Sequence, residues 1–237
     1  ERDGFQIAAR IECLVNSDTD TGMAKTLGLA VLGLTDALAQ MRPDLLLLIA
    51  DRYEMLAPAS VALTLRIPVA HIEGGEVSEG AIDDAVRNAL TKMSHVHFTS
   101  TDTARARVIS MGEEPWRVHR AGAPSLDHLT RSQLLTRSEL QQSLKIDLKP
   151  SPTVVAYHPV TLLQNTTVEA DALFTALAQI EGQIIFCYPN ADAGSHSLMQ
   201  RTHEFLRQHA DAHVFVNLGA VTYWSLLQHA GLLLGNS

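Results

Sequence analysis

The chain has 237 residues, of which 46% are hydrophobic and 19% are charged, and its net charge is −8. This composition can supply a folded core and argues against a disordered chain. The excess of acid argues against nucleic acid or an anionic membrane as a partner. The longest strongly apolar run, residues 45–50, is far shorter than the ~20 residues that cross a bilayer. Cys13 and Cys187 form no C-x-x-C pair, so we expect reduced thiols, no zinc site and a cytoplasmic location.

Strand and helix patterns alternate through the first half of the chain. Apolar residues recur at spacings of three and four over residues 21–41, which predicts a helix that Pro43 stops. The unbroken apolar run at 45–50 predicts a strand of a parallel sheet, buried on both faces. Further helices are predicted at 53–66, 80–92 and 101–111, and further strands at 69–72, 96–99 and 118–120.

A second alternating region follows a polar stretch. Residues 129–150 are rich in Ser, Gln and Lys and predict an interdomain segment. Strands are then predicted at 154–157, 184–187, 214–216 and 232–234, with helices between them. The expected fold is α/β, with two doubly wound parallel sheets of Rossmann type. The expected domains are residues 1–128 and 151–237.

Chemically competent side chains follow several of the predicted strands. Asp51 follows the first buried strand, Glu73 follows the second, and Asp83 opens the next helix; His158 follows the first strand of the second domain. Three of the four have a structural alternative: Asp51 as a helix cap, Asp83 as a partner of Arg87, and His158 as a structural histidine. Glu73 directly precedes two glycines, where the backbone must approach another group closely. Ligands bind at the carboxyl ends of the strands in parallel sheets. The presence of these four side chains at such strand ends therefore predicts a site in a cleft between the domains.

Other signature motifs give little support to other chemistries. His71 and Glu73 are two residues apart, as are His95 and His97, so the side chains of either pair could share one face of a strand and chelate a metal. Parallel-sheet strands usually bury both faces, and polar groups there often bond to neighbouring protein groups. We therefore expect no metal. No G-x-G-x-x-G, Walker A or G-x-S-x-G motif occurs. Residues 235–237, Gly-Asn-Ser, follow the last strand, where a glycine turn can present N–H groups to a phosphate.

Several motifs together resemble one enzyme family. In the first domain these are residues 51–54 (DRYE), 71–76 (HIEGGE), 79–87 (EGAIDDAVR) and 91–95 (TKMSH). In the second they are residues 157–161 (YHPVT) and 189–195 (PNADAGS). This set resembles the hydrolysing UDP-N-acetylglucosamine 2-epimerases, which make N-acetylmannosamine for sialic acid synthesis or act on 2,4-diacetamido sugars for legionaminic acid.

The resemblance implies a GT-B fold, with the nucleotide sugar between two Rossmann-like domains. It implies that Asp51, Glu73 and Asp83 are the catalytic acids and that His158 lies near the diphosphate. Residues implied to bind the substrate or its nucleotide are Arg87, Pro189, Asn190, Asp192, Gly194, Ser195, Gly235, Asn236 and Ser237. Asn88 departs from the family, which usually has histidine after the arginine. The family's opening strand, with a Gly-Thr-Arg loop, and its closing segment have no counterpart in residues 1–237.

The reaction implied is anti elimination of UDP followed by hydration of the resulting glycal. Asp51 and Asp83 are expected to transfer the proton at C2 of the sugar, and Glu73 to stabilise charge at C1 and guide water there. His158 would offset charge on the leaving diphosphate. No cofactor is needed, because the stereocentre inverts through a proton and not a hydride. The resemblance also suggests a homodimer or homotetramer.

Three other functions fit the same residues. A non-hydrolysing epimerase would return the sugar still linked to its nucleotide. A GT-B glycosyltransferase would leave C2 of the sugar untouched and would need an acceptor pocket. A module that binds nucleotide sugars without catalysis would hold UDP and form no product.

Overall fold

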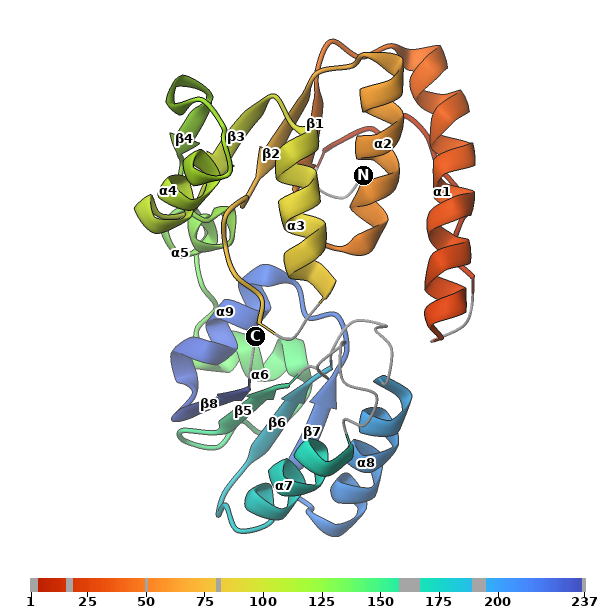
Figure 1. Cartoon of the computed structure of the whole chain (residues 1–237). Helices are drawn as coiled ribbons and strands as arrows, with labels where there is room; N and C mark the ends of the chain where they lie inside the picture. Colours follow the sequence, from red (N-terminus) through yellow and green to blue (C-terminus); the bar gives the residue numbers. More distant parts are fainter. Residues whose placement is uncertain are drawn as a thin grey trace. The chain divides into compact units, whose positions relative to one another are not determined.

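The computed structural model describes residues 4–15, 19–49, 51–79, 82–157, 167–188 and 195–235, without the side chains of 167–169 and 195–197. The chain divides into two compact units, Glu1–Ala123 and Pro124–Ser237, which we call unit 1 and unit 2. Each unit has its own parallel sheet (Figure 1).

The four strands of unit 1 lie in the order β1-β2-β3-β4, which is also their order in the chain. These strands are β1 (Leu46–Ile49), β2 (Val69–Ile72), β3 (Val96–Thr99) and β4 (Val118–Arg120). The helices of unit 1 are α1 (Asp20–Met41), η1 (Tyr53–Met55), α2 (Leu56–Leu65), α3 (Ile82–Met93), α4 (Asp102–Ser110) and η2 (Pro115–Arg117). Because all the strand pairs are parallel, the carboxyl ends of these strands share one edge of the sheet.

Helix α1 is long and apolar enough to cross a membrane by length and composition, with 22 residues. In this structure it packs along α2 (Figure 1). The Thr19 side chain caps its first turn by accepting a hydrogen bond from the Gly22 N–H. Leu38, near its end, joins a core with Leu48 of β1 and Leu90 of α3. One side of α1 therefore belongs to the core of unit 1.

Strand β1 forms where the apolar run predicts it, but its expected burial on both faces is wrong. Leu48 is buried against α1, α2 and α3, whereas Leu47 and Ile49 on the opposite face are 58% and 48% exposed. The reason is packing: α1, α2 and α3 cover the Leu48 face, and the face with Leu47 and Ile49 is left exposed. An unbroken apolar run therefore does not show whether one face of a strand is covered or both.

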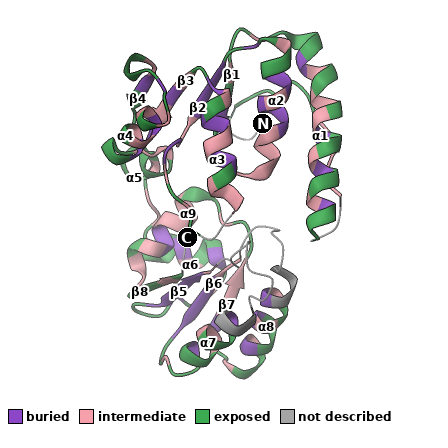
Figure 2. Ribbon diagram, in the orientation of Figure 1, coloured by how far each residue is buried: buried purple, intermediate pink, exposed green. Residues whose placement is uncertain are grey.

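Unit 2 has the strand order β7-β6-β5-β8. Its strands are β5 (Thr153–Ala156), β6 (Ile184–Cys187), β7 (Ala212–Phe215) and β8 (Leu232–Gly235). Its helices are η3 (Pro124–Leu126), α5 (Asp127–Arg131), α6 (Arg137–Leu144), α7 (Thr167–Leu177), α8 (Ser195–Gln208) and α9 (Ala220–His229). Strand β5 is buried along its whole length (purple in Figure 2). The chain builds outward from β5 to β7 and then returns to β5's other side as β8, so the sheet is doubly wound and its topological switch point lies between β5 and β8.

Residues 129–150, predicted as an interdomain segment, pack into the core of unit 2. Leu140, Leu144 and Leu148 contact the buried side chains of Val154 and others of the sheet. Helix α6 starts with a capping box between Thr136 and Glu139. The division between the units accordingly falls at 123–124, before the predicted segment. Residues 129–150 have a polar composition because α6 is amphipathic, and only a few of its leucines face the core.

Candidate active site

Two of the predicted acids lie at neighbouring strand ends of unit 1. Strands β1 and β2 are parallel neighbours with Ile49 opposite Ile72. Asp51 follows the first of these strands and Glu73 follows the second, so the sheet brings the two carboxyl groups to one edge. After burial, the nearby negative charge of Asp51 also raises the pKa of Glu73. The structure therefore brings together the two acids that the strand pattern singled out.

Arg87 of α3 joins this pair of acids. Its Nη2 forms an ion pair with Asp51 Oδ2 and donates a hydrogen bond to Ser78 Oγ at 3.1 Å. The Arg87 side chain is 8% exposed and that of Asp51 is 23% exposed. Among the described residues, Nε and Nη1 of Arg87 have no hydrogen-bond partner although both are buried. Buried donors without partners are costly, so Arg87 is a candidate for binding acceptor oxygens of a ligand.

The environment of Glu73 suits proton transfer. Burial raises the pKa of Glu73, and the charges of Asp51 and then Glu76 raise it as well, while Arg87 acts in the opposite direction. Glu73 also has a φ of 68°, in the left-handed region where side chains other than glycine are strained. Raised pKa values and backbone strain both gather at functional sites. Glu73 is thus the acid with the most independent signs of a functional role.

The start of α3 carries the other predicted acid. Asp83 lies in the first turn and is half-buried, and it precedes Arg87 by one helical turn, so both lie on one face of α3. Asn88, the departure from the family, donates to Asp84 Oδ2 at 3.3 Å. Asp84 Oδ1 also accepts the Ser78 N–H at 3.3 Å. Asn88 and Ser78 therefore support the start of α3, a role that their sequence positions did not reveal.

Most of the predicted nucleotide residues lie outside the described residues. These are His158, Pro189, Asn190, Asp192, Gly194, Asn236 and Ser237. Ser195 is the first residue of α8, and Gly235 is the last residue of β8. A Cβ atom on Gly235 would collide with the carbonyl oxygen of Ala156 on β5, so strand packing alone requires glycine there. Both residues nevertheless lie at the carboxyl end of a strand or the start of a helix, as a nucleotide site requires.

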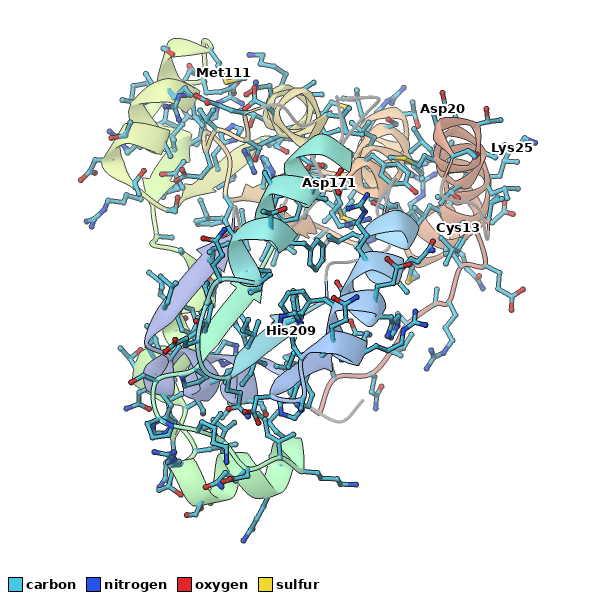
Figure 3. All side chains as sticks on the ribbon, turned by 90° about the horizontal axis from the view of Figure 1, so that it is seen from below. Cys13, Asp20, Lys25, Met111, Asp171 and His209 are labelled. Atoms are coloured by element: carbon cyan, nitrogen blue, oxygen red, sulfur yellow. The ribbon has the colours of Figure 1, made fainter. Side chains whose placement is uncertain are left out.

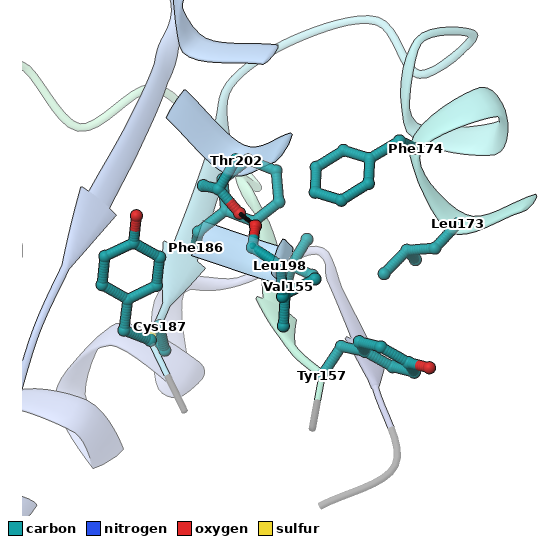
Figure 4. A pocket seen from close by; sticks show the side chains of 9 residues that line it. Val155, Tyr157, Leu173, Phe174, Phe186, Cys187, Leu198 and Thr202 are labelled. Atoms are coloured by element: carbon teal, nitrogen blue, oxygen red, sulfur yellow. Dashed lines mark hydrogen bonds between the residues drawn. The ribbon is translucent and has the colours of Figure 1, made fainter. Parts of the chain in front are cut away.

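The described part of unit 2 has a small apolar cavity beside the carboxyl ends of β5 and β6 (Figure 4). Tyr157, Phe174, Phe186 and Cys187 line it together with aliphatic side chains. Its volume of ≈ 10 Å³ leaves room for about one water molecule. Burial raises the pKa of Cys187 to about 11, which keeps this thiol protonated and unreactive. The described side chains around this cavity are mostly apolar, and several of them belong to the core of unit 2.

A larger groove of ≈ 280 Å³ lies between α7 and α8. Asp171 of α7 and His209, just after α8, are among its lining residues (Figure 3). Arg201 pairs with Asp171, and the His209 ring stacks on Phe205 with centroids 3.8 Å apart. The groove lies on the helical layer, away from the strand ends, and none of the predicted site residues lines it.

The histidines weighed as metal ligands have protein partners. His71 Nδ1 lies 3.4 Å from Thr91 Oγ1, His97 Nε2 lies 3.2 Å from Glu113 Oε2, and His95 Nδ1 accepts the Val69 N–H at 3.2 Å. Within the described ranges, no three His, Cys, Asp or Glu residues are grouped to hold a metal ion.

Comparison with known proteins identifies the family. The sequence model of the UDP-N-acetylglucosamine 2-epimerases matches residues 1–237. The chain belongs to the UDP-N-acetylglucosamine 2-epimerase family. It is 34% identical over 236 residues to the GDP/UDP-N,N'-diacetylbacillosamine 2-epimerase (hydrolyzing) of Campylobacter jejuni, covering 98% of this chain. It is also 34% identical over 236 residues to the UDP-N,N'-diacetylbacillosamine 2-epimerase (hydrolyzing) of Legionella pneumophila, covering 99% of this chain. The chain spans 62% of the length of each relative.

Solved structures of this family share the fold. The UDP-N-acetylglucosamine 2-epimerase of Neisseria meningitidis, bound to UDP-N-acetylglucosamine, superimposes with a TM-score of 0.73 at 17% identity, over 94% of this chain and 62% of that one. The enzyme of Methanocaldococcus jannaschii, in complex with UDP-N-acetylglucosamine and UDP, gives 0.71 at 19% identity, over 91% and 61%. The predicted fold class, two α/β units of GT-B type, is confirmed.

Proposed function

We propose that this chain forms part of a hydrolysing 2-epimerase that acts on a UDP-linked N-acetyl amino sugar. Family membership supports the proposal, and both relatives described above are named as hydrolysing enzymes. The observation that carries it is the meeting of Asp51, Glu73 and the buried Arg87 at neighbouring strand ends of unit 1. A weakly acidic C–H bond needs carboxyl groups that are partly desolvated and held in place, and this cluster offers them.

In the proposed reaction, a base removes the C2 proton while the C1–O bond to UDP breaks, and water then adds to the glycal. Asp51 and Asp83 transfer the proton at C2, and Arg87 fixes the orientation of Asp51 through their ion pair. Glu73, with its raised pKa, stabilises charge at C1 and takes a proton from the incoming water. The free Nε and Nη1 donors of Arg87 bind a substrate oxygen.

Unit 2 is proposed to bind the UDP group. Its topological switch point lies between β5 and β8, and such points are the usual place for a nucleotide. Gly235 ends β8 at this point, and His158 follows β5 by two residues in the sequence. Binding of the diphosphate by His158 and by the residues around Asn190 and Ser195 would ease departure of UDP.

The proposed reaction has a free amino sugar as its product. A free 2-epimerised amino sugar, N-acetylmannosamine or a 2,4-diacetamido analogue, would feed synthesis of a sialic-type acid. Both cysteines are unpaired, which fits a reducing compartment such as the cytoplasm. A homodimer or homotetramer stays a prediction.

A substrate panel tests the function. Purified full-length protein is incubated with UDP- and GDP-linked N-acetyl sugars, and the products are identified by mass spectrometry. We expect a free 2-epimerised sugar and one equivalent of released nucleotide. An epimerised sugar still linked to its nucleotide would indicate the non-hydrolysing reaction. Transfer to an acceptor would indicate a glycosyltransferase, and UDP binding without any product would indicate a binding module.

A further inference from the structure

The turn at residues 73–76 has a backbone that needs outside support. Glu73 and Gly75 both have positive φ, 68° and 84°. Only glycine adopts such a φ without cost, so Glu73 keeps it only where neighbouring groups hold it. A Cβ atom on Gly75 would collide with the carbonyl oxygen of Ala104 in α4. The turn is therefore pressed directly against α4, the helix that follows the next strand.

Four groups from β3, α4 and the two residues between them bind this turn. The Glu73 N–H donates to Phe98 O at 2.8 Å, which fixes the start of the turn. Ser100 Oγ donates to the Glu76 carboxylate, as does Thr101 Oγ1 at 3.3 Å, which fixes its end. Arg107 Nη1 donates to Gly75 O, which fixes the middle. Of these groups, Arg107 is the side chain that reaches the strained backbone itself.

Arg107 acts from a helix that is itself anchored. Arg105, two residues earlier on α4, donates to Val118 O at 2.9 Å and to Pro115 O at 3.3 Å. The Thr101 side chain caps the helix by accepting the Ala104 N–H. Arg105 therefore ties α4 to β4 and η2, whereas Arg107 ties α4 to the turn that carries Glu73.

We propose that Arg107 is a positioning residue for Glu73: its bond to Gly75 O holds the strained turn so that the Glu73 carboxyl faces Asp51 and Arg87. The role in turnover rests on the proposed function, but the role in ordering the turn does not. Arg107 is half-buried and has no described contact with Asp51, Glu73 or Arg87 side chains, so it acts only through the backbone. Nothing in the sequence distinguishes Arg107 from Arg105, since both are arginines on one short helix.

Paired variants separate the two arginines. In Arg107→Ala we expect kcat to fall roughly ten- to a hundredfold with little change in KM, because the carboxyl loses its alignment and binding elsewhere is kept. Arg107→Lys, which can still donate to Gly75 O, should recover part of the loss. Arg105→Ala, the matched control, should lower thermal stability and leave kcat near that of the wild type.

Two further readouts distinguish positioning from general destabilisation. Hydrogen exchange in the 73–76 turn should become faster in Arg107→Ala and stay unchanged in Arg105→Ala. The limb of the pH–kcat profile that reports Glu73 should move to lower pH in Arg107→Ala, as the carboxyl becomes more hydrated. If Arg107→Ala does not fold, Ser100→Ala can be used instead. It removes the hydrogen bond from Ser100 to the Glu76 carboxylate at the end of the turn, and we expect the same changes with smaller size.

The role of Arg107 in the turn and the epimerase activity of the protein can be tested separately. Unchanged exchange in the turn, with kcat and pH profile equal to those of Arg105→Ala, would overturn the positioning role. If the wild-type protein converts no sugar nucleotide, the proposed function is wrong. Faster hydrogen exchange of the 73–76 turn in Arg107→Ala would still support the role of Arg107 in ordering that turn.

Discussion

At the scale of single residues, Glu73 combines properties that oppose folding. Its φ is positive, and its carboxyl is partly buried beside the Asp51 charge. A carboxyl whose pKa is raised on folding stabilises the fold only while protonated. That contribution is present below its ordinary pKa and is lost as pH rises through the raised value. Natural proteins keep such residues where function requires them.

Glu73→Gln should therefore stabilise the protein while it stops the reaction. We expect a thermal midpoint roughly 2 °C above that of the wild type at pH 8, and no gain at about pH 4, where the wild-type carboxyl is protonated. Thermal unfolding at the two pH values measures this. A lower midpoint at pH 8 would show that the charge of Glu73 stabilises the fold.

Asp51→Asn should lower kcat by about a hundredfold or more, because it removes a carboxylate from the reacting site and weakens the hold on Arg87. Glu54→Gln is the matched control. Glu54 lies three residues further on, and its partner among the described residues is Arg52 at 3.1 Å. Wild-type turnover in Asp51→Asn would remove Asp51 from the proposed chemistry.

The sequence predicts Asp51 and Glu73 well, because a residue directly after a strand of a parallel sheet has its place fixed by topology. It does not predict the partner of Arg87. The i,i+4 spacing to Asp83 suggests a pair within the helix, and no local pattern indicates the ion pair of Arg87 with Asp51, 36 residues away in sequence. Such a contact depends on how α3 packs on the sheet, which local spacing does not encode.

At the scale of elements, Glu113 links three parts of unit 1. Its carboxylate is 2% exposed and pairs with Lys92 at the end of α3, with Arg117 of η2 at 2.8 Å and with His97 of β3 at 3.2 Å. Burial alone would raise the pKa of Glu113, but the hydrogen bond from Lys92 and the charges of Arg117 and Lys92 outweigh it, and the pKa is lowered. Burial lowers the pKa of His97, against the opposing effect of Glu113.

Glu113→Gln should destabilise the protein by about 2 kcal/mol at neutral pH, because it removes the buried carboxylate that binds Lys92, Arg117 and His97. Glu114→Gln, on a carboxyl side chain that is 64% exposed, should change little. Urea unfolding of both variants measures the difference.

Stability should also fall with pH in two stages. Because the pKa of His97 is lowered on folding, stability decreases as pH falls below the ordinary histidine value of about 6.5. Because the pKa of Glu113 is lowered, its contribution is lost as pH falls from the ordinary glutamate value through the folded one. In Glu113→Gln the second stage should be missing. An unchanged pH profile in that variant would show that other carboxyl groups dominate acid unfolding.

At the scale of the whole molecule, the alternation of strands and helices predicts two α/β units, and the structure confirms it. The division between them is not predicted, because the polar surface of α6 hides leucines that belong to the core of unit 2. The exposed face of β1 is likewise not predicted, since apolar composition does not report which faces of a strand are covered by helices. Local pattern thus predicts the elements, whereas packing decides their boundaries and faces.

The place of α6 in unit 2 has a direct test. Leu140→Ala, at a fully buried side chain, should cost about 2–5 kcal/mol of unfolding free energy. Leu129→Ala, at a side chain that is 45% exposed, should cost far less. Equal small effects would show that residues 129–150 are not part of the core.

The central claim is that carboxyl groups of unit 1 exchange a proton at C2 of a sugar while its nucleotide leaves. The most direct measurement is turnover of the sugar nucleotide in D2O by the full-length protein, followed by mass spectrometry and NMR of the product. We predict free UDP and a free 2-epimerised sugar that carries one deuterium at C2. A product with no deuterium at C2 would contradict the claim.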